Sequence, residues 1–123
     1  MIETVSFIDL EEGDKDLILS FALEEEGDFV RSLILHRTLF CESILPEEER
    51  GTIVHLEGEQ LEEGQEYLNT LEEFVFDGTT IRIKSRFSHY MIDARKLDIK
   101  EFKTIEDALK RQNLDARFQI KFT

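Results

Sequence analysis

Several residue types are scarce in this sequence, and each scarcity argues against a class of protein. There is no tryptophan, one proline and one cysteine, Cys41. A lone thiol forms no disulfide within the chain, and together with the lack of a signal peptide it predicts a reducing, cytoplasmic location. No apolar run approaches the ~18 residues that a membrane-spanning helix needs, so we expect no membrane partner. The aromatic residues are mainly phenylalanine, ten in number, which favours a packed core over a surface that stacks sugars.

Motifs that carry catalysis or hold cofactors are also missing. The six glycines form neither a dinucleotide-binding GxGxxG pattern nor the GxxxxGK pattern of a P-loop. No acidic run has the spacing of a calcium-binding EF-hand loop, and no serine or cysteine stands in a nucleophile motif. We therefore expect no cofactor. The sequence leaves catalysis open but favours a non-catalytic role.

Basic residues are scarce in the first 73 residues, which hold 21 Asp and Glu against 4 Lys and Arg. The following 50 residues hold 7 Asp and Glu against 11 Lys and Arg, and the whole chain has a net charge of −13. Nucleic-acid-binding modules normally carry net positive charge, so we expect no nucleic-acid partner. An imbalance of this size predicts the electrostatic character of a protein partner and says nothing about the fold.

Length and hydrophobic patterning predict one α+β domain over residues 1–123. A chain of 123 residues, 41% of them hydrophobic, can bury one core, whereas two domains divided near residue 73 would each be marginal. Apolar residues alternate in 17–23 and 116–122, and Asp77-Gly78 between apolar runs predicts a two-residue hairpin turn. We expect a twisted, mainly antiparallel sheet of about six or seven strands with one or two helices.

One helix is predicted over Thr104–Gln112 and a second over Leu61–Leu71. Thr104 and Asp107 have the spacing of a capping box, with Asp in place of Glu, and the two basic residues of the last turn suit the helix dipole. The second helix rests on apolar residues three or four positions apart.

Acidic residues concentrate at predicted loops, among them one between the strands over 17–23 and 29–38 and one around Pro46. They form a candidate recognition surface for a basic protein, because rim charges steer encounter and select against acidic competitors. Small acidic inhibitors of basic nucleases or toxins, such as immunity proteins and antitoxins, have this general character, and the analogy is one of class alone. The alternative is that these charges serve solubility. The candidate partner-binding residues are Glu24, Glu25, Glu26, Asp28, Glu47, Glu48 and Glu49.

Histidines support an alternative function, a metal- or small-ligand-binding domain resembling a β-barrel, with or without catalysis. Each of the three histidines falls in a predicted strand, and Glu57 shares a face with His55. Their spacing matches no HxH, HxxH or HExxH pattern, and the competing interpretation is that they are ordinary sheet or surface histidines. The candidate ligands are His36, His55, Glu57 and His89.

Basic residues recur at alternate positions of two predicted strands in the second half. If these strands are neighbours, they form a basic face that either binds phosphate groups or is a solvated face partly neutralised by acids of the first half. A third hypothesis is a homodimer in which basic strands of one copy meet acidic loops of the other. The basic face consists of Arg82, Lys84, Arg86, Arg117 and Lys121.

Overall fold

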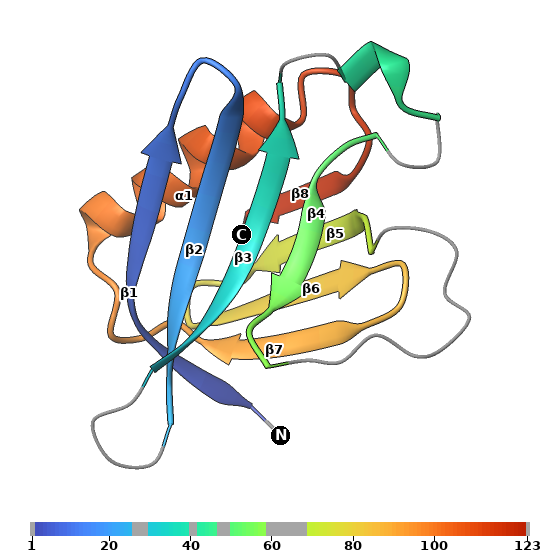
Figure 1. Ribbon diagram of the computed structural model, residues 1–123. Coiled ribbons are helices and arrows are strands. Elements are labelled where there is room, and N and C mark those ends of the chain that lie inside the picture. Colours follow the sequence, from blue (N-terminus) through green and yellow to red (C-terminus); the bar gives the residue numbers. More distant parts are fainter. Residues whose placement is uncertain (1, 26–29, 40–41, 47–49, 59–68, 123) are drawn as a thin grey trace.

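The computed structural model describes residues 2–25, 30–39, 42–46, 50–58 and 69–122. In this part of the chain, eight strands form one sheet and one α-helix packs against it (Figure 1). The α+β class and the mainly antiparallel sheet are confirmed, whereas the expected six or seven strands were too few. The elements are β1 (Glu3–Glu12), β2 (Asp16–Glu24), β3 (Val30–Thr38), the 3₁₀ turn η1 (Glu42–Ile44), β4 (Ile53–Leu56), β5 (Leu71–Phe76), β6 (Thr80–Ser85), β7 (His89–Asp93), α1 (Ile99–Gln112) and β8 (Gln119–Phe122).

The strand order β4-β3-β2-β1-β7-β6-β5-β8 divides into two halves that meet at β1 and β7. Neighbouring strands are antiparallel except at β1–β7 and β5–β8, which are parallel. At the junction only Glu3 and Thr4 of β1 are in register with β7, and Figure 1 shows the two halves crossing there. Because strands twist, so short a junction lets the halves turn one face of each toward the other.

The hydrophobic core lies between these two inner faces. Leu17, Leu19 and Phe21 are buried at alternate positions of β2, as the sequence pattern predicts. The ring centroid of Phe21 lies 6.3 Å from that of Phe74 on β5, so side chains of the two halves are in contact. Burying each such side chain contributes about 1.5–3 kcal/mol, and the buried residues of both halves form one continuous cluster.

Helix α1 completes this cluster with its own apolar stripe. Ile105, Ala108 and Leu109 are buried in the core, at the three- and four-residue spacing of one helix face. At the start of the helix, a carboxylate oxygen of Glu101 accepts a hydrogen bond from the backbone N–H of Ile8 on β1 (3.2 Å). The helix is therefore joined to the sheet by a polar contact as well as by packing.

The C-terminal end of α1 is as predicted, but the helix begins earlier, after Asp98. Asp98 and Glu101 form the capping box, each side chain accepting from the backbone N–H of the other, at 2.8 and 3.2 Å. The predicted capping box of Thr104 and Asp107 is wrong. Thr104 lies inside the helix, where its hydroxyl donates to the carbonyl of Lys100 (2.9 Å).

Two further sequence predictions differ in part from the structure. The second predicted helix falls on residues 61–68, outside the described residues, while Leu71 at its end belongs to β5 and the helix prediction is wrong there. The hairpin at Asp77 is confirmed, and the N–H of Asp77 donates to the carbonyl of Thr80 (3.2 Å). Its two central residues are thus Gly78 and Thr79, and Gly78 adopts φ +100°, a conformation that glycine adopts without strain.

Buried polar groups tie the end of α1 to the first half of the sheet. Gln112 is 0% exposed, and its Nε2 donates to the carbonyls of Leu17 and Leu35, both at 3.1 Å. Its Oε1 accepts from the hydroxyl of Thr52 (3.4 Å). Because an unsatisfied buried amide costs several kcal/mol, these bonds specify where the helix end sits.

Arg37, at the end of β3, binds two carboxylates from different parts of the chain. Its guanidinium, in a residue only 7% exposed, pairs with Glu42 of η1 (2.7 Å), with Asp115 after α1 (2.8 Å) and with the carbonyl of Gln112. The hydrogen bond from Arg37 holds the pKa of Asp115 well below its usual value. Partial burial raises the pKa of Glu42, but the bonds from Arg37 and the N–H of Gly51 outweigh it and leave that pKa lowered.

Replacing Arg37 should be strongly destabilising. The substitution Arg37→Met keeps the apolar stem but removes the cation between Glu42 and Asp115, and Asp115 alone keeps a second cation, Arg117. We therefore expect a loss of about 3 kcal/mol. Urea unfolding at neutral pH measures it. The matched control is Arg95→Met, since Arg95 forms an exposed ion pair with Asp93 and should cost less than about 1 kcal/mol. Equal losses in both variants would contradict the structural role of Arg37.

The same cluster predicts acid sensitivity. A carboxyl whose pKa is lowered in the folded state adds stability at neutral pH, and that stability is lost as the pH falls below the unfolded value of about 4. We therefore expect the urea midpoint of the wild type to begin to fall near about pH 5 and to continue falling below about pH 3. In Arg37→Met the contribution of Asp115 to this slope should shrink to the part that Arg117 supplies, and an unchanged slope would show that the acid sensitivity arises elsewhere.

Candidate functional site

The outer side of the β1–β4 half carries an accessible acidic surface. Val54 and Leu56 of β4 are buried, so Ile53 and His55 face the opposite side of this strand, and Glu57 follows the end of the strand. The same alternation applies to β2 and β3, where the leucines point inward. We name this outer surface the acidic face. It comprises the carboxylates Asp9, Glu11, Asp16, Glu24 and Glu57, the histidines His36 and His55, and the apolar residues Phe7, Ile18, Ile34 and Ile53.

Strand register places these side chains in rows across the sheet. Directly paired residues of neighbouring strands project from the same side. One row is Glu11, Ile18, His36 and Ile53, the next is Asp9, Ser20, Ile34 and His55, and a third is Phe7, Ala22 and Ser32. Ile18 and Ile34 therefore lie near the middle, Glu11 and Asp9 end the first two rows on β1, and Ile53 and His55 end them on β4.

The acidic face has no cation of its own within these described strands. β1 to β4 contain two arginines, Arg31 and Arg37, and both occupy the inward parity of β3. Arg31 forms ion pairs with Glu3 and Glu25, and Arg37 is held in the buried cluster described above. With the arginines of these strands on the inner side, the outer side keeps a negative field that, among the described ion pairs of its strand carboxylates, Lys96 compensates only at Glu24.

The centre of the acidic face is apolar and reachable. Phe7 is 52% exposed, and Ile18, Ile34 and Ile53 are half-buried. His36 contacts Asp16, at the start of β2, through a hydrogen bond between Nε2 and Oδ1 (2.7 Å). Apolar residues bordered by carboxylates on β1 and at the two ends of β2 have the composition of a protein interface with a charged rim.

The sequence-predicted acidic residues only partly overlap this face. Glu24 lies on it and pairs with Lys96, while Glu25 pairs with Arg31. The remaining predicted residues, Glu26, Asp28, Glu47, Glu48 and Glu49, are outside the described residues.

Sequence reasoning missed Asp9 and Glu11 as candidates for binding. Their signal was the alternation of Phe7, Asp9 and Glu11 along β1, which marks one solvent-facing side of a strand. The alternation became informative only with the register, because pairing Asp9 with Ser20 and Glu11 with Ile18 shows which side of the sheet they share.

The four candidate metal ligands do not assemble. His36 and His55 lie in adjacent rows of the acidic face, Glu57 accepts from the N–H of Ser32 (3.4 Å), and His89 is on β7 in the other half. Among the described residues, no group of three or more His, Cys, Asp or Glu side chains is placed to hold a metal ion. The described residues therefore supply no set of ligands for the hypothesised metal ion.

The predicted basic face is divided by β5. Arg82 and Lys84 are exposed on β6 and Lys121 is exposed on β8, but β5 lies between these strands with Val75 and Glu73 opposite the basic residues. Arg86 and Arg117 line a different depression of about 270 Å³, which also contains Glu72. The strands after residue 73 are thus richer in basic residues than β1–β4, but these residues do not form one unbroken basic stripe.

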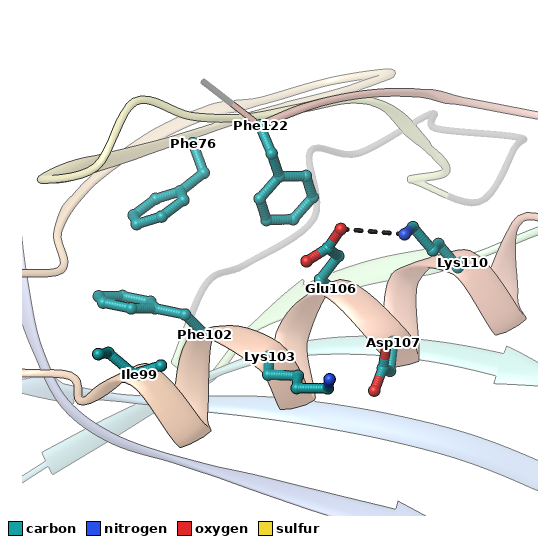
Figure 2. Close-up of a pocket in the computed structure, with 8 residues that line it drawn as sticks. All are labelled: Phe76, Ile99, Phe102, Lys103, Glu106, Asp107, Lys110 and Phe122. Atoms are coloured by element: carbon teal, nitrogen blue, oxygen red, sulfur yellow. Dashed lines mark hydrogen bonds and ion pairs between the residues drawn. The ribbon is translucent and has the colours of Figure 1, made fainter.

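A groove with aromatic walls lies between α1 and the strands β5 and β8. It has a volume of about 500 Å³. Figure 2 shows Phe76 and Phe122 pointing from the strands toward the helix, with Phe102 pointing back, and Glu106 bonded to Lys110 (2.9 Å). The lining residues are Phe76, Ile99, Phe102, Lys103, Glu106, Asp107, Lys110 and Phe122. Such walls can accept apolar side chains.

No protein-family model, curated protein or solved structure matches this chain. Within the described ranges, no helix is long and apolar enough to cross a membrane. The proposals that follow therefore rest on the geometry alone.

Reversing charge on the acidic face should leave the fold intact. In the variant Asp9→Lys/Glu11→Lys, two exposed carboxylates that no described cation pairs with are replaced, so the unfolding free energy should change by less than about 0.5 kcal/mol. The contrasting variant Leu19→Ala, on the inner side of β2, should cost about 2–5 kcal/mol. Chemical unfolding of both variants measures the difference. A large loss in the charge-reversed variant would mean that these carboxylates are structural.

Proposed function

We propose that this chain is a non-catalytic interaction module that binds a basic protein through the acidic face. The observation that carries the proposal is the uneven placement of charge in β1–β4: Asp9, Glu11, Asp16 and Glu24 project outward beside Ile18 and Ile34, while both arginines of these strands project inward. A role as inhibitor of a basic enzyme or toxin, similar in class to immunity proteins and antitoxins, fits this surface.

The two components of the acidic face would have different roles in binding. Carboxylates at the rim raise the rate of encounter with a cationic surface and disfavour acidic competitors, but each adds little affinity on its own. The half-buried residues Ile18, Ile34 and Ile53 supply apolar area that is removed from water when the partner covers them. The partner's matching surface is therefore expected to be rich in Lys and Arg around a few apolar side chains.

Existing ion pairs decide which acidic residues suit the rim. Glu25 already neutralises Arg31 and contributes less to the outward field than its charge suggests. Glu24 is held by Lys96 and would have to exchange that partner for a cation of the bound protein. Asp9 and Glu11, which no described cation contacts, are thus better candidates for the rim than the pair at the β2–β3 loop.

Parallel capture experiments test this function. The wild type, the face variant Asp9→Lys/Glu11→Lys and the control Glu72→Lys/Glu73→Lys are immobilised and exposed to the same native lysate at low salt. The control makes the same change in net charge on β5, in the other half of the sheet. We expect the protein captured by the wild type and the control to be basic, and the face variant to capture little of it.

Association kinetics with the purified partner then distinguish the effect of charge at the acidic face from the effect of net charge. The face variant should associate about tenfold more slowly than the wild type and show a weaker salt dependence, while the control stays near the wild type. Equal association rates for the face variant and the control, or a captured protein that is acidic, would show that this face is not the binding surface.

A further inference from the structure

The two edges of the sheet differ in how much backbone they leave open. At one edge, β4 is joined to the start of β5: Ile53 bridges to Thr70, and the N–H of Val54 donates to the carbonyl of Asn69 (2.9 Å). At the other edge, β8 bonds to β5 on one side, and among the described residues no backbone group of 119–122 bonds on its other side. An open edge of this kind is a template for another strand.

Beside the open edge of β8 lies the aromatic groove described above. Phe122 of β8 forms one wall and Phe102 of α1 forms another, so a strand added to β8 would cover the groove. Ile99, at the start of α1, also lines the groove and is 84% exposed. A large apolar side chain this exposed beside an apolar groove marks a candidate contact surface.

Charge on the groove rim differs from that of the rest of the chain. Two lysines, Lys103 and Lys110, and two acids, Glu106 and Asp107, line it, so its formal charge is zero in a chain of net charge −13. Two copies approaching through their acidic faces would repel each other, whereas two copies approaching through this rim bring together equal numbers of both signs. The balanced rim therefore fits a second copy of this chain.

We propose that a second copy docks at this groove, with the two β8 strands pairing antiparallel across a two-fold axis. Centring the pair on Ile120 places Lys121 opposite Gln119 of the other copy and Ile120 opposite its counterpart. Centring it on Lys121 would place two lysines opposite each other, which is unfavourable. In the first register the sheet continues through both copies, and the exposed apolar groups beside β8 are brought toward the interface.

The acidic face takes no part in this dimer. The groove and β8 share no residue with the outer side of β1–β4, so each copy keeps its own binding face. The assembly would be bivalent, and a partner with two basic sites would be held more tightly than by one copy. The dimer and the proposed function can therefore fail independently.

Sedimentation of the purified chain tests the dimer. At about 100 µM the wild type should have twice the monomer mass. Raising the salt from about 0.05 M to about 0.5 M should preserve or strengthen the dimer, because two chains of like net charge repel less when screened. A homodimer made by basic strands docking on acidic loops would weaken instead. A monomer at this concentration, or a dimer that salt dissolves, overturns the proposal.

A matched pair of substitutions locates the interface. Ile99→Asp should raise the dimer dissociation constant more than tenfold, while Leu114→Asp should leave it unchanged. Leu114 is 86% exposed and does not line the groove. Hydrogen exchange supplies a second measurement: protection of the 119–122 amides should rise with protein concentration in the wild type and not in Ile99→Asp. Equal dimerisation of the two variants, or amides whose protection is independent of concentration, would rule out pairing at β8.

Discussion

Side chains at alternate positions of β2 and β3 lie in two different environments, and most of this structure depends on that alternation. Leu19 and Phe21 in β2 and Leu33 and Leu35 in β3 point inward and are buried. Because successive side chains of a strand point to opposite sides, the residues between them must face outward. The hydrophobic core thus determines indirectly which polar residues form the outer surface. A register shift of one residue would expose the leucines and bury the carboxylates, and the cost of doing so keeps the register unique.

Arg37 connects this alternation to the rest of the chain. It occupies an inward position of β3, where a bare cation would be costly, and it is accepted there because Glu42 and Asp115 approach from either side. These two contacts join η1 and the segment after α1 to the end of the strand. Gln112 binds the carbonyls of Leu17 and Leu35 nearby. The helix end is thus positioned by directional polar bonds, while the body of the helix is held by less directional apolar packing.

This arrangement determines which of the negative charges face outward and which are paired inside the molecule. The negative charge of the first half is spread over many positions, and a number of its carboxylates are used inside the molecule, as Glu42 is by Arg37 and Glu3 is by Arg31. What distinguishes the acidic face is that the cations of its own strands are on the other side. A partner that brings its own cations finds Asp9 and Glu11 there without a described ion pair and competes with Lys96 at Glu24, around isoleucines that are already partly exposed. The groove at β8 is of the opposite kind, since its rim is balanced in charge and its walls are aromatic.

Local sequence determined much of the secondary structure of this protein and the side of each strand that is buried, because period-two alternation and turn residues act over a few positions. It predicted the strand over 17–23, the two sides of β4, the hairpin at Asp77 and the end of α1. Tertiary structure alone decided the parallel pairs β1–β7 and β5–β8, and hence that β5 separates the basic residues of β6 and β8. It also decided that Asp9 and Glu11 share a face with Ile18 and Ile34, whereas Glu24 and Glu25 are paired. Such facts depend on contacts between residues far apart in the chain, and the free energy of those contacts comes from burial and pairing that no short segment possesses.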